Sequence, residues 1–149
     1  MKTVLVTGGA GFIGSHLCEA LLQAGHTVVN LDSFNDYYAP AIKRSNVDET
    51  RAFMKRCHIP DERYAVVEGD IRNRERLKEV FTLHSFDAIV HLAAYAGVRP
   101  SIEQPVLYTD VNINGTVNLL EMCRQNGVPS FLFASSSSVY GNNEKVPFA

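Results

Sequence analysis

The sequence predicts an α/β protein built on a doubly wound parallel sheet, and three observations lead to this fold class. Short apolar runs alternate with segments of helical periodicity. The runs are continuously apolar, which is typical of parallel strands covered on both faces, and right-handed crossovers then place helices on each side. Each run is also followed within two residues by glycine, aspartate, alanine or serine, and ligands bind such sheets beyond the carboxyl ends of their strands.

Five strands are predicted along the chain. They span Thr3–Thr7, Thr27–Leu31, Tyr64–Val67, Phe86–Leu92 and Phe131–Ala134. Glycines follow the first strand, Asp32 follows the second, and Gly69 and Asp70 follow the third. Two alanines follow the fourth strand and four serines follow the fifth. Because the carboxyl ends of parallel strands meet at one edge of the sheet, these residues are expected to converge on one crevice.

Helical periodicity fills the intervals between strands. The first apolar stripe consists of Ile13, Leu17, Leu21 and Ala24, and Gly25 stands where a C-terminal cap is expected. Asn73 can cap a second helix, whose apolar side carries Leu77, Val80, Phe81 and His84. A long helix is predicted from Pro105 to Asn126, ended by Gly127 and Pro129. Its apolar stripe includes Ile113, Val117 and Leu120.

The segment Ser33–Arg63 is long for a connection between two strands. Two tyrosines and Pro40 come first, and scattered apolar residues among many charges follow. We expect a loop followed by one helix, which together form a surface insertion without chemistry of its own. A functional loop is the alternative, because long ordered loops are often functional.

Composition and charge exclude several classes of protein. The 149 residues suggest one domain, with 14 Lys and Arg against 16 Asp and Glu, so no basic surface for nucleic acid is expected. No apolar run approaches the roughly 20 residues of a membrane helix, and no signal peptide is expected. Three cysteines without C-x-x-C spacing predict free thiols in a reducing cytoplasm, and the five histidines have no metal-ligand spacing, so no metal site is predicted.

The strongest motif is the glycine turn after the first strand. Gly8 permits the tight turn, Gly11 lets the backbone approach a pyrophosphate, and Gly14 lets the helix pack closely on the strand. Phe12 and Ile13 open the helix, whose N-terminus favours an anion. A glycine turn between a strand and a helix, with an acid at the end of the next strand, predicts a Rossmann-type dinucleotide site.

Two aspartates are expected to hold the adenosine half of the dinucleotide. Asp32 can accept hydrogen bonds from both ribose hydroxyls and would repel a 2′-phosphate, and no Lys or Arg follows until Lys43, so NAD is expected as the cofactor. Asp70 can hydrogen-bond the adenine, and Ile71 can contact it through apolar atoms. A loop aspartate that makes a turn without a ligand is the alternative for Asp70.

Several segments resemble the extended short-chain dehydrogenase/reductase family, and within it the nucleotide-sugar epimerases. The resemblance is carried by Thr7–Gly14, Gly69–Ile71, His91–Ala94 and Ser135–Gly141. Asn35–Tyr38, Ala96–Ser101 and Ser135–Gly141 are most similar to UDP-glucuronate 4-epimerases. The resemblance implies NAD as cofactor, a UDP-sugar substrate, a homodimer, transient oxidation at C4 of the sugar, and hydride return to the opposite face.

The resemblance also implies roles for further residues. Ser136 matches the catalytic hydroxyl that contacts the sugar's 4-oxygen, and Ser137 and Ser138 would help to seat the sugar. Leu92, Ala93, Ala94 and Asn112 match positions that line or order the cofactor site. Arg99 could meet a substrate phosphate or carboxylate, with an ordinary surface role as the alternative. His91 is expected to be a packed core residue rather than a ligand.

The family's catalytic pair, a tyrosine followed four residues later by lysine, does not occur in these 149 residues. We therefore expect an incomplete Rossmann-type NAD-binding domain over residues 1–149, truncated after the fifth strand and inactive alone. It would be the N-terminal part of an epimerase that lacks its C-terminal substrate region. A UDP-glucose 4-epimerase or a UDP-sugar decarboxylase of the same family is one alternative, and a non-catalytic NAD-binding module is another.

Overall fold

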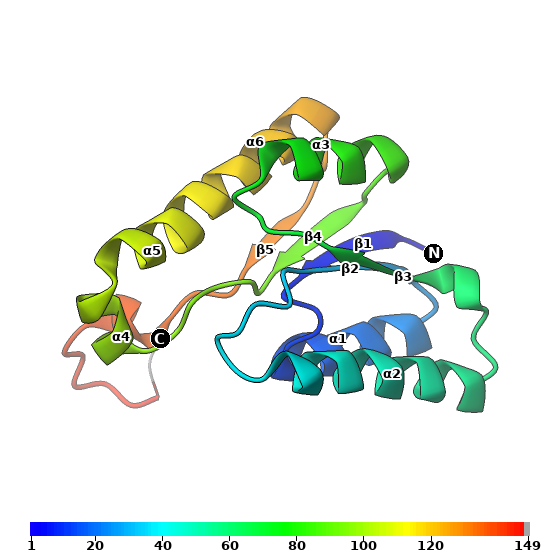
Figure 1. Ribbon diagram of the computed structural model, residues 1–149, viewed down its shortest axis with the longest axis horizontal. Helices are drawn as coiled ribbons and strands as arrows, with labels where there is room; N and C mark the ends of the chain where they lie inside the picture. Colours follow the sequence, from blue (N-terminus) through cyan, green and yellow to red (C-terminus); the bar gives the residue numbers. More distant parts are fainter. Residues whose placement is uncertain (148–149) are drawn as a thin grey trace.

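A five-stranded sheet forms the centre of the protein in the computed structural model, which describes residues 1–147 (Figure 1). Its strands are β1 (Thr3–Thr7), β2 (Thr27–Asp32), β3 (Tyr64–Glu68), β4 (Ala88–His91) and β5 (Phe131–Phe133). All neighbouring strands are parallel and the order is β3-β2-β1-β4-β5. From β1 the chain adds β2 and then β3 on one side, and it then crosses to add β4 and β5 on the other side of β1. The winding of the sheet therefore reverses beside β1. The doubly wound sheet predicted from the sequence is confirmed.

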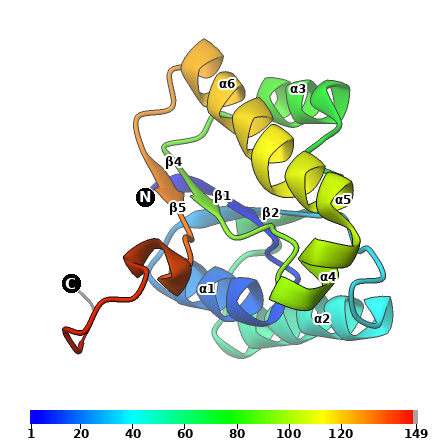
Figure 2. The same ribbon diagram turned by 90° about the vertical axis from the view of Figure 1, so that its left-hand side faces the viewer.

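Helices cover both faces of the sheet. They are α1 (Phe12–Gln23), α2 (Pro40–Arg56), α3 (Arg74–Leu83), α4 (Val98–Glu103), α5 (Pro105–Thr109) and α6 (Thr116–Asn126). The pair α1 and α2 lies on one face, and α3 and α6 lie on the other (Figures 1 and 2). Asn73 caps α3 as predicted, because its side chain accepts a hydrogen bond from the Arg76 amide.

Each face of the sheet has its own apolar core. Leu5 points into the core under α3 and α6, whereas Val4 and Val6 point into the core under α1 and α2. This alternation follows from the two-residue period of a strand. Burying each such side chain contributes on the order of 1.5–3 kcal/mol, so the continuously apolar strand is explained by two buried faces. Cys18 and Cys123 are buried, one in each core, and Cys57 is exposed; all three are free thiols.

The first helix is rotated relative to the stripe that its sequence suggests. Gly14, Cys18 and Leu22 are buried. Of the predicted stripe, Leu17 and Leu21 are half-buried against the core, whereas Ile13 is 68% exposed. A Cβ on Gly14 would lie 2.1 Å from the carbonyl oxygen of Gly8. Close contact at this glycine therefore fixes the helix rotation, and the apolar spacing does not.

The predicted long helix is present between its expected ends but is not uniform. A π-helical segment, Asp110–Gly115, joins α5 to α6, and Gly127 ends α6 in the left-handed conformation with a φ of 64°. Ile113, Val117 and Leu120 are 57%, 55% and 45% exposed. The core side of the helix is instead formed by Val111, Leu119, Met122 and Cys123. The short helix α4 was not predicted, because its six residues are too few for a clear period.

The segment between β2 and β3 is a loop followed by one helix, as expected. Pro40 stands at the start of α2, and Val47 and Met54 pack into the core of that face. Its first residues, however, lie over the carboxyl ends of the strands, where the sequence suggested a surface insertion without chemistry. Ser33 and Asn35 line a pocket there.

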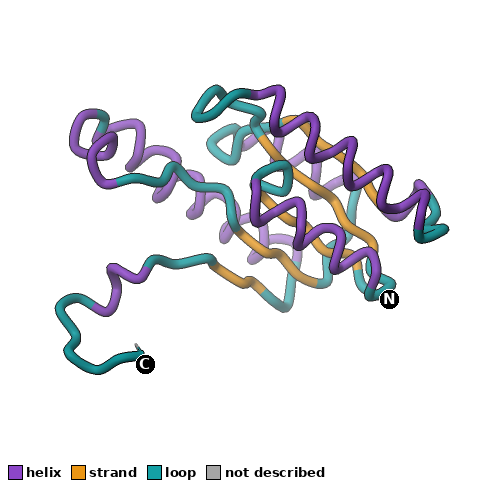
Figure 3. Tube along the Cα trace, turned by 90° about the horizontal axis from the view of Figure 1, so that it is seen from below, coloured by secondary structure: helices purple, strands orange, loops and turns teal. Residues whose placement is uncertain are grey.

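The chain beyond β5 lies away from the body of the protein. Residues 132–147 are all exposed, and Figure 3 shows this segment running past the end of the sheet. Across residues 1–147, no group of three or more His, Cys, Asp and Glu side chains could hold a metal ion. None of the helices in that range is long and apolar enough to cross a membrane.

Candidate functional site

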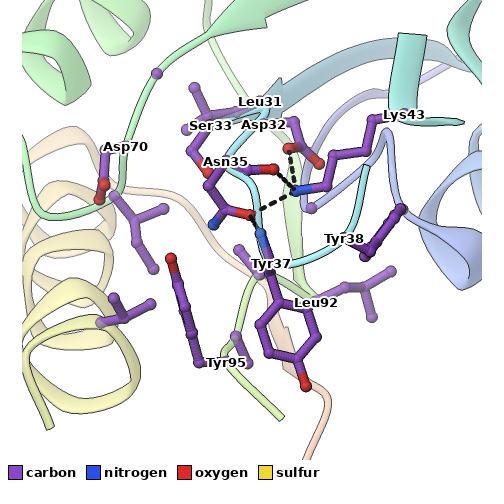
Figure 4. A pocket seen from close by; sticks show the side chains of 17 residues that line it. Leu31, Asp32, Ser33, Asn35, Tyr37, Tyr38, Lys43, Asp70, Leu92 and Tyr95 are labelled. Atoms are coloured by element: carbon purple, nitrogen blue, oxygen red, sulfur yellow. Dashed lines mark hydrogen bonds and ion pairs between the residues drawn. The ribbon is translucent and has the colours of Figure 1, made fainter. Parts of the chain in front are cut away.

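A pocket opens at the carboxyl ends of β1, β2, β3 and β4, where the winding of the sheet reverses (Figure 4). It is lined by Gly8, Gly11, Leu31, Asp32, Ser33, Asn35, Tyr37, Tyr38, Lys43, Gly69, Asp70, Ile71, Leu92, Ala93, Ala94, Tyr95 and Val111. The loop after β2 forms one wall and the loop after β4 forms the other. Of the predicted cofactor residues, this pocket brings together Gly8, Gly11, Asp32, Asp70, Ile71, Leu92, Ala93 and Ala94.

The glycine turn leaves room for backbone to approach a ligand. Gly8 has a φ of 71°, and a Cβ there would lie 2.9 Å from the Ala93 amide nitrogen, so only glycine fits without strain. The first amides of α1 have no acceptor within the helix and provide a site for an anion. Phe12 and Ile13 contribute only backbone there, because their side chains are 76% and 68% exposed and do not line the pocket.

Asp32 is held in place by backbone donors on both sides of the pocket. Its Oδ2 accepts a hydrogen bond from the Ala10 amide at 3.1 Å, and its Oδ1 accepts one from the Phe34 amide at 2.9 Å. The residue is 6% exposed. The carboxylate is therefore oriented by the glycine turn and by the loop after β2, and remaining acceptor capacity faces the pocket.

Lys43 lines the pocket beside Asp32, so the separation along the chain that is expected to keep cations away from this carboxylate does not hold in space. Its Nζ lies 2.7 Å from Asn35 Oδ1, 3.1 Å from the Asn35 carbonyl oxygen and 3.8 Å from Asp32 Oδ1, and it is 5% exposed. It also lies over the ring of Tyr38, at 4.9 Å from the centroid. The first turn of α2 folds back beside β2, so the charge of Asp32 is partly compensated despite eleven residues of separation along the chain.

Tyr38 has a buried hydroxyl with no hydrogen-bond partner among the described residues. A Cβ on Gly11 would lie 3.5 Å from this oxygen, so the hydroxyl is next to the glycine turn. A buried donor without a partner is costly, and an anion at the turn would satisfy it. The residues of the pocket therefore fit a dinucleotide, whose diphosphate would lie at the turn and whose ribose would lie near Asp32.

Asp70 is paired with Arg72 rather than free in the pocket. Arg72 donates to both carboxylate oxygens, with Nη2 2.7 Å from Oδ2, and its amide donates to Oδ1 at 2.8 Å. Partial burial alone would raise the pKa of Asp70, but the hydrogen bonds and charge of Arg72 outweigh it and lower the pKa. The same guanidinium reaches Asp110 at 3.3 Å, so it joins the pocket to the π-helical segment.

A second pocket adjoins the first through Leu92, Ala93, Ala94 and Tyr95. Asn112 lies in it and holds the Tyr95 backbone from both sides: it donates to the carbonyl oxygen at 2.9 Å and accepts from the amide at 2.8 Å. This arrangement explains why an asparagine inside a helix can order the loop after β4. The residue does not line the first pocket.

The serine segment contributes one predicted residue to the second pocket. Ser136 lines it, and its Oγ lies 3.0 Å from the Ser138 hydroxyl. Ser137 and Ser138 form the start of a short 3₁₀ turn, Ser137–Tyr140, and do not line either pocket. Arg99 is exposed on α4 and is likewise outside both linings.

His91 is buried, as expected for a packed residue, and both ring nitrogens are used. Nδ1 lies 2.6 Å from Thr7 Oγ1, which accepts the Ala93 amide, and Nε2 lies 2.9 Å from Thr116 Oγ1, which donates to the Asn112 carbonyl. These partners assign the ring proton to Nε2. Burial lowers the pKa of His91 to about 4, so the ring is neutral at pH 7.

The sheet order, the glycine turn and the pocket at the reversal of winding define a Rossmann-type fold. A sequence model described as the NAD dependent epimerase/dehydratase family matches residues 4–149. The chain belongs to this family.

Named relatives agree with that assignment. UDP-glucuronate 4-epimerase 4 of Arabidopsis thaliana is 50% identical over 148 residues, which is 99% of this chain and 32% of the relative. A UDP-glucose 4-epimerase of Klebsiella pneumoniae is 39% identical, with 97% of this chain and 96% of that sequence covered. The chain thus spans about a third of the length of the Arabidopsis relative.

Solved structures share the fold. The crystal structure of UDP-glucose-4-epimerase from Stenotrophomonas maltophila, with bound NAD and formylated UDP-arabinopyranose, has a TM-score of 0.84 at 38% identity. The alignment covers 99% of this chain and 40% of that one. UDP-glucose 4-epimerase of Thermus thermophilus in complex with NAD has a TM-score of 0.73 at 39% identity, with 90% and 37% covered.

Proposed function

We propose that residues 1–149 form an NAD-binding unit and the N-terminal part of a UDP-sugar 4-epimerase that acts on UDP-glucuronate. The observation that carries this proposal is the 50% identity to a UDP-glucuronate 4-epimerase over nearly the whole chain. The pocket supports it, because its glycine turn, buried carboxylate and unpaired tyrosine hydroxyl suit a dinucleotide.

Different parts of the crevice are proposed to contact different parts of the cofactor. The turn from Gly8 to Gly14, with the Phe12 and Ile13 amides, would hold the diphosphate, and Asp32 would accept from the ribose hydroxyls. Asp70 and Ile71 would contact the adenine. Leu92, Ala93 and Ala94 would form the floor beyond it, with Asn112 fixing the loop that follows. When bound, NAD would accept a hydride from C4 of the sugar and return it.

The proposed substrate contacts lie on the side of the second pocket. Ser136 would hydrogen-bond the sugar's 4-oxygen and support the charge that develops there. Its place in a pocket contiguous with the proposed cofactor site supports this role. Ser137, Ser138 and Arg99 are proposed as further substrate residues on the strength of the resemblance alone, because they lie outside the pocket lining.

Calorimetric titration of the chain with NAD and with NADP tests the cofactor. We expect NAD to bind at least tenfold more tightly, since Asp32 repels a 2′-phosphate. Equal affinities would contradict the role of Asp32, and an absence of binding to either would contradict the proposed NAD site. Gly14→Ala is expected to abolish binding, because the added Cβ would collide with the Gly8 carbonyl oxygen.

UDP-glucose is the second candidate substrate. The Klebsiella relative and the Stenotrophomonas structure are both named as UDP-glucose 4-epimerases, at 39% and 38% identity. The whole protein, assayed with UDP-glucuronate and UDP-glucose in parallel, separates the candidates by the ratio of kcat/KM. Release of carbon dioxide from UDP-glucuronate would instead identify a decarboxylase.

The present chain is proposed to bind cofactor without turning over sugar, since no tyrosine is followed four residues later by lysine. Incubation with NAD and UDP-glucuronate is expected to give no epimer. Epimer formation by the 149 residues would contradict this. If the gene continued without a Tyr-x-x-x-Lys motif, a non-catalytic NAD-binding module would be the better interpretation.

A homodimer in the cytoplasm is the proposed state of the whole protein. Its support is the stripe of Ile113, Val117 and Leu120, which is about half exposed on one side of the α5–α6 helical region. Sedimentation of the whole protein and of Val117→Lys tests this. We expect a dimer that the lysine disrupts, and a monomeric unaltered protein would contradict the proposal.

A further inference from the structure

Two loops from opposite sides of the crevice are joined by one side chain. Tyr37 lies in the loop after β2, and its hydroxyl donates a hydrogen bond of 2.7 Å to the carbonyl oxygen of Ala96, in the loop after β4. These residues are 59 positions apart in the chain. The strands that precede them, β2 and β4, lie on either side of β1, so the bond spans the point where the winding reverses.

Further contacts surround the Tyr37 ring, its hydroxyl and the base of its loop. The Tyr37 ring meets the Tyr95 ring edge to face, with centroids 5.3 Å apart. A Cβ on Gly97, whose φ is 95°, would lie 3.5 Å from the Tyr37 oxygen. The amide of Tyr37 donates to Asn35 Oδ1, which also accepts from Lys43, so the base of the loop is held on its own side. Figure 4 shows Tyr37 next to Tyr95 at the pocket.

We propose that Tyr37 is a positioning residue that closes the crevice over the bound cofactor and controls how quickly the cofactor exchanges. Tyr37, Asn35 and Tyr95 all line the pocket, and the bridge joins its two walls. A dinucleotide lying along the pocket would pass under the bridge, so entry and departure both require the bond to open. This inference rests on the proposed binding of NAD, and retention suits an epimerase whose hydride must return from the same cofactor molecule.

The chain contains a matched control for the bridge. Tyr108 donates a hydrogen bond of 2.6 Å to the same Ala96 carbonyl oxygen and also meets the Tyr95 ring edge to face, at 5.6 Å. It belongs to α5, only twelve residues from Ala96, and therefore lies on the same wall of the crevice. Tyr37→Phe and Tyr108→Phe each remove one hydroxyl donor from the same acceptor, but only Tyr37→Phe removes a hydrogen bond between the two walls, while its ring can still meet Tyr95.

Stopped-flow measurements with NADH as a fluorescent probe test the proposal. Association is followed directly, and dissociation is followed by a chase with excess NAD. We expect Tyr37→Phe to raise both rate constants by about two- to tenfold, the effect of losing one hydrogen bond, while the Kd changes little. Tyr108→Phe is expected to leave both rate constants within twofold of the unaltered chain. A thermal unfolding curve with an unaltered midpoint shows that each variant is folded.

Three results would overturn the bridge. The first is that Tyr37→Phe exchanges cofactor at the unaltered rate. The second is that both variants accelerate exchange equally, which would assign the effect to the loss of either donor at the Ala96 carbonyl rather than to a link between the walls. The third is that dissociation alone accelerates, which would make Tyr37 a direct cofactor contact.

Hydrogen exchange without ligand separates this inference from the proposed function. In the ligand-free chain, amides of residues 33–38 are expected to exchange about two- to tenfold faster in Tyr37→Phe than in Tyr108→Phe, because opening of the loop no longer breaks a bond. Equal exchange rates in the two variants would contradict the proposed bridge, whether or not the chain binds NAD. Failure of the unaltered chain to bind NADH or NAD would instead contradict the proposed function.

Discussion

Asp32, Asn112 and His91 each use both of their polar atoms on partners within the chain. Two of them hold backbone groups of the crevice walls directly. His91 does so through Thr7, which accepts from the Ala93 amide, and through Thr116, which donates to the Asn112 carbonyl oxygen. Side chains fixed in this way keep their positions before a ligand arrives, which lowers the ordering cost of binding. At the scale of single residues, the crevice is therefore largely preorganised by buried hydrogen bonds.

The buried imidazole predicts a pH dependence of stability. Its pKa falls from 6.5 in the unfolded chain to about 4 in the folded protein because burial disfavours the charged ring. Between these values the unfolded state binds more protons, so the free energy of unfolding decreases as pH falls from about 6.5 to 4, by up to about 3 kcal/mol. Urea denaturation at pH 7.5 and pH 5 measures this change. His91→Gln should show a smaller loss between the two pH values, and an equal loss would contradict the assignment.

Lys43 predicts a charge effect on cofactor choice. Its ammonium partly neutralises Asp32, so Lys43→Met should repel a 2′-phosphate more strongly and raise the ratio of NAD to NADP affinity by about fivefold. The ratio of the two affinities reports the effect of the charge alone, because a looser loop after β2 would weaken the binding of NAD and of NADP alike. Arg44→Met, an exposed neighbour on α2, is the control and should leave the ratio unchanged. Calorimetry measures both, and a ratio that fell in Lys43→Met would refute the argument.

At the scale of elements, the helix from Pro105 to Asn126 changes its winding where it crosses the pocket. The π-helical segment Asp110–Gly115 places Val111 against the first pocket and Asn112 against the second. π-helical turns occur frequently at functional sites. Gly115 allows this approach, because a Cβ there would lie 2.6 Å from two carbon atoms of Ile71.

Gly115→Ala is therefore expected to destabilise the protein by about 1–3 kcal/mol through overpacking. Chemical denaturation measures the change. Adding Ile71→Ala removes the opposing carbon atoms, so the double variant should lose less than the sum of the two single losses. Strict additivity would show that the contact is not the cause.

Sequence periodicity predicted the five strands and the ends of the long helix, since these depend on local apolar pattern and on breakers such as Gly127. It predicted the buried side of α1 only in part, since Leu17 and Leu21 pack against the core whereas Ile13 is exposed, and it did not predict the buried side of α6. In α1 that side is set by contact between Gly14 and the Gly8 carbonyl, and in α6 by the π-helical segment. A close glycine contact and a change of helical winding are both features that apolar spacing along one helix does not encode.

The residues of the candidate site were likewise predicted from the sequence only in part. Gly8, Gly11, Asp32, Asp70 and the residues after β4 were placed by their positions at strand ends, a consequence of parallel topology. Lys43, Tyr37 and Tyr38 were missed because they come from a long connection whose path over the crevice has no periodic signal. Two features of the sequence hinted at this: the tyrosine pair before Pro40, and the resemblance of Asn35–Tyr38 to UDP-glucuronate 4-epimerases.

At the scale of the whole molecule, β5 leaves one edge of the sheet uncovered by another strand of the described chain. Its Leu132 and Phe133 are 55% and 56% exposed. Exposed apolar edge strands promote pairing between chains.

We expect the 149-residue chain to self-associate as its concentration rises, and Leu132→Lys to reduce this by placing a charge on the edge. Light scattering across a concentration series measures the effect. Leu83→Lys changes an equally apolar residue, 76% exposed at the end of α3, and serves as the control. If both variants reduced association alike, net charge rather than the strand edge would be responsible.

The segment beyond β5 is wholly exposed, and it carries Ser136, whereas the glycine turn and Asp32 belong to the buried centre. Under the proposed function, NAD binding belongs to the buried centre, whereas the contact with the sugar belongs to the exposed segment. We expect protease cleavage between residues 134 and 136 to leave NAD binding intact and to remove the proposed sugar contact at Ser136.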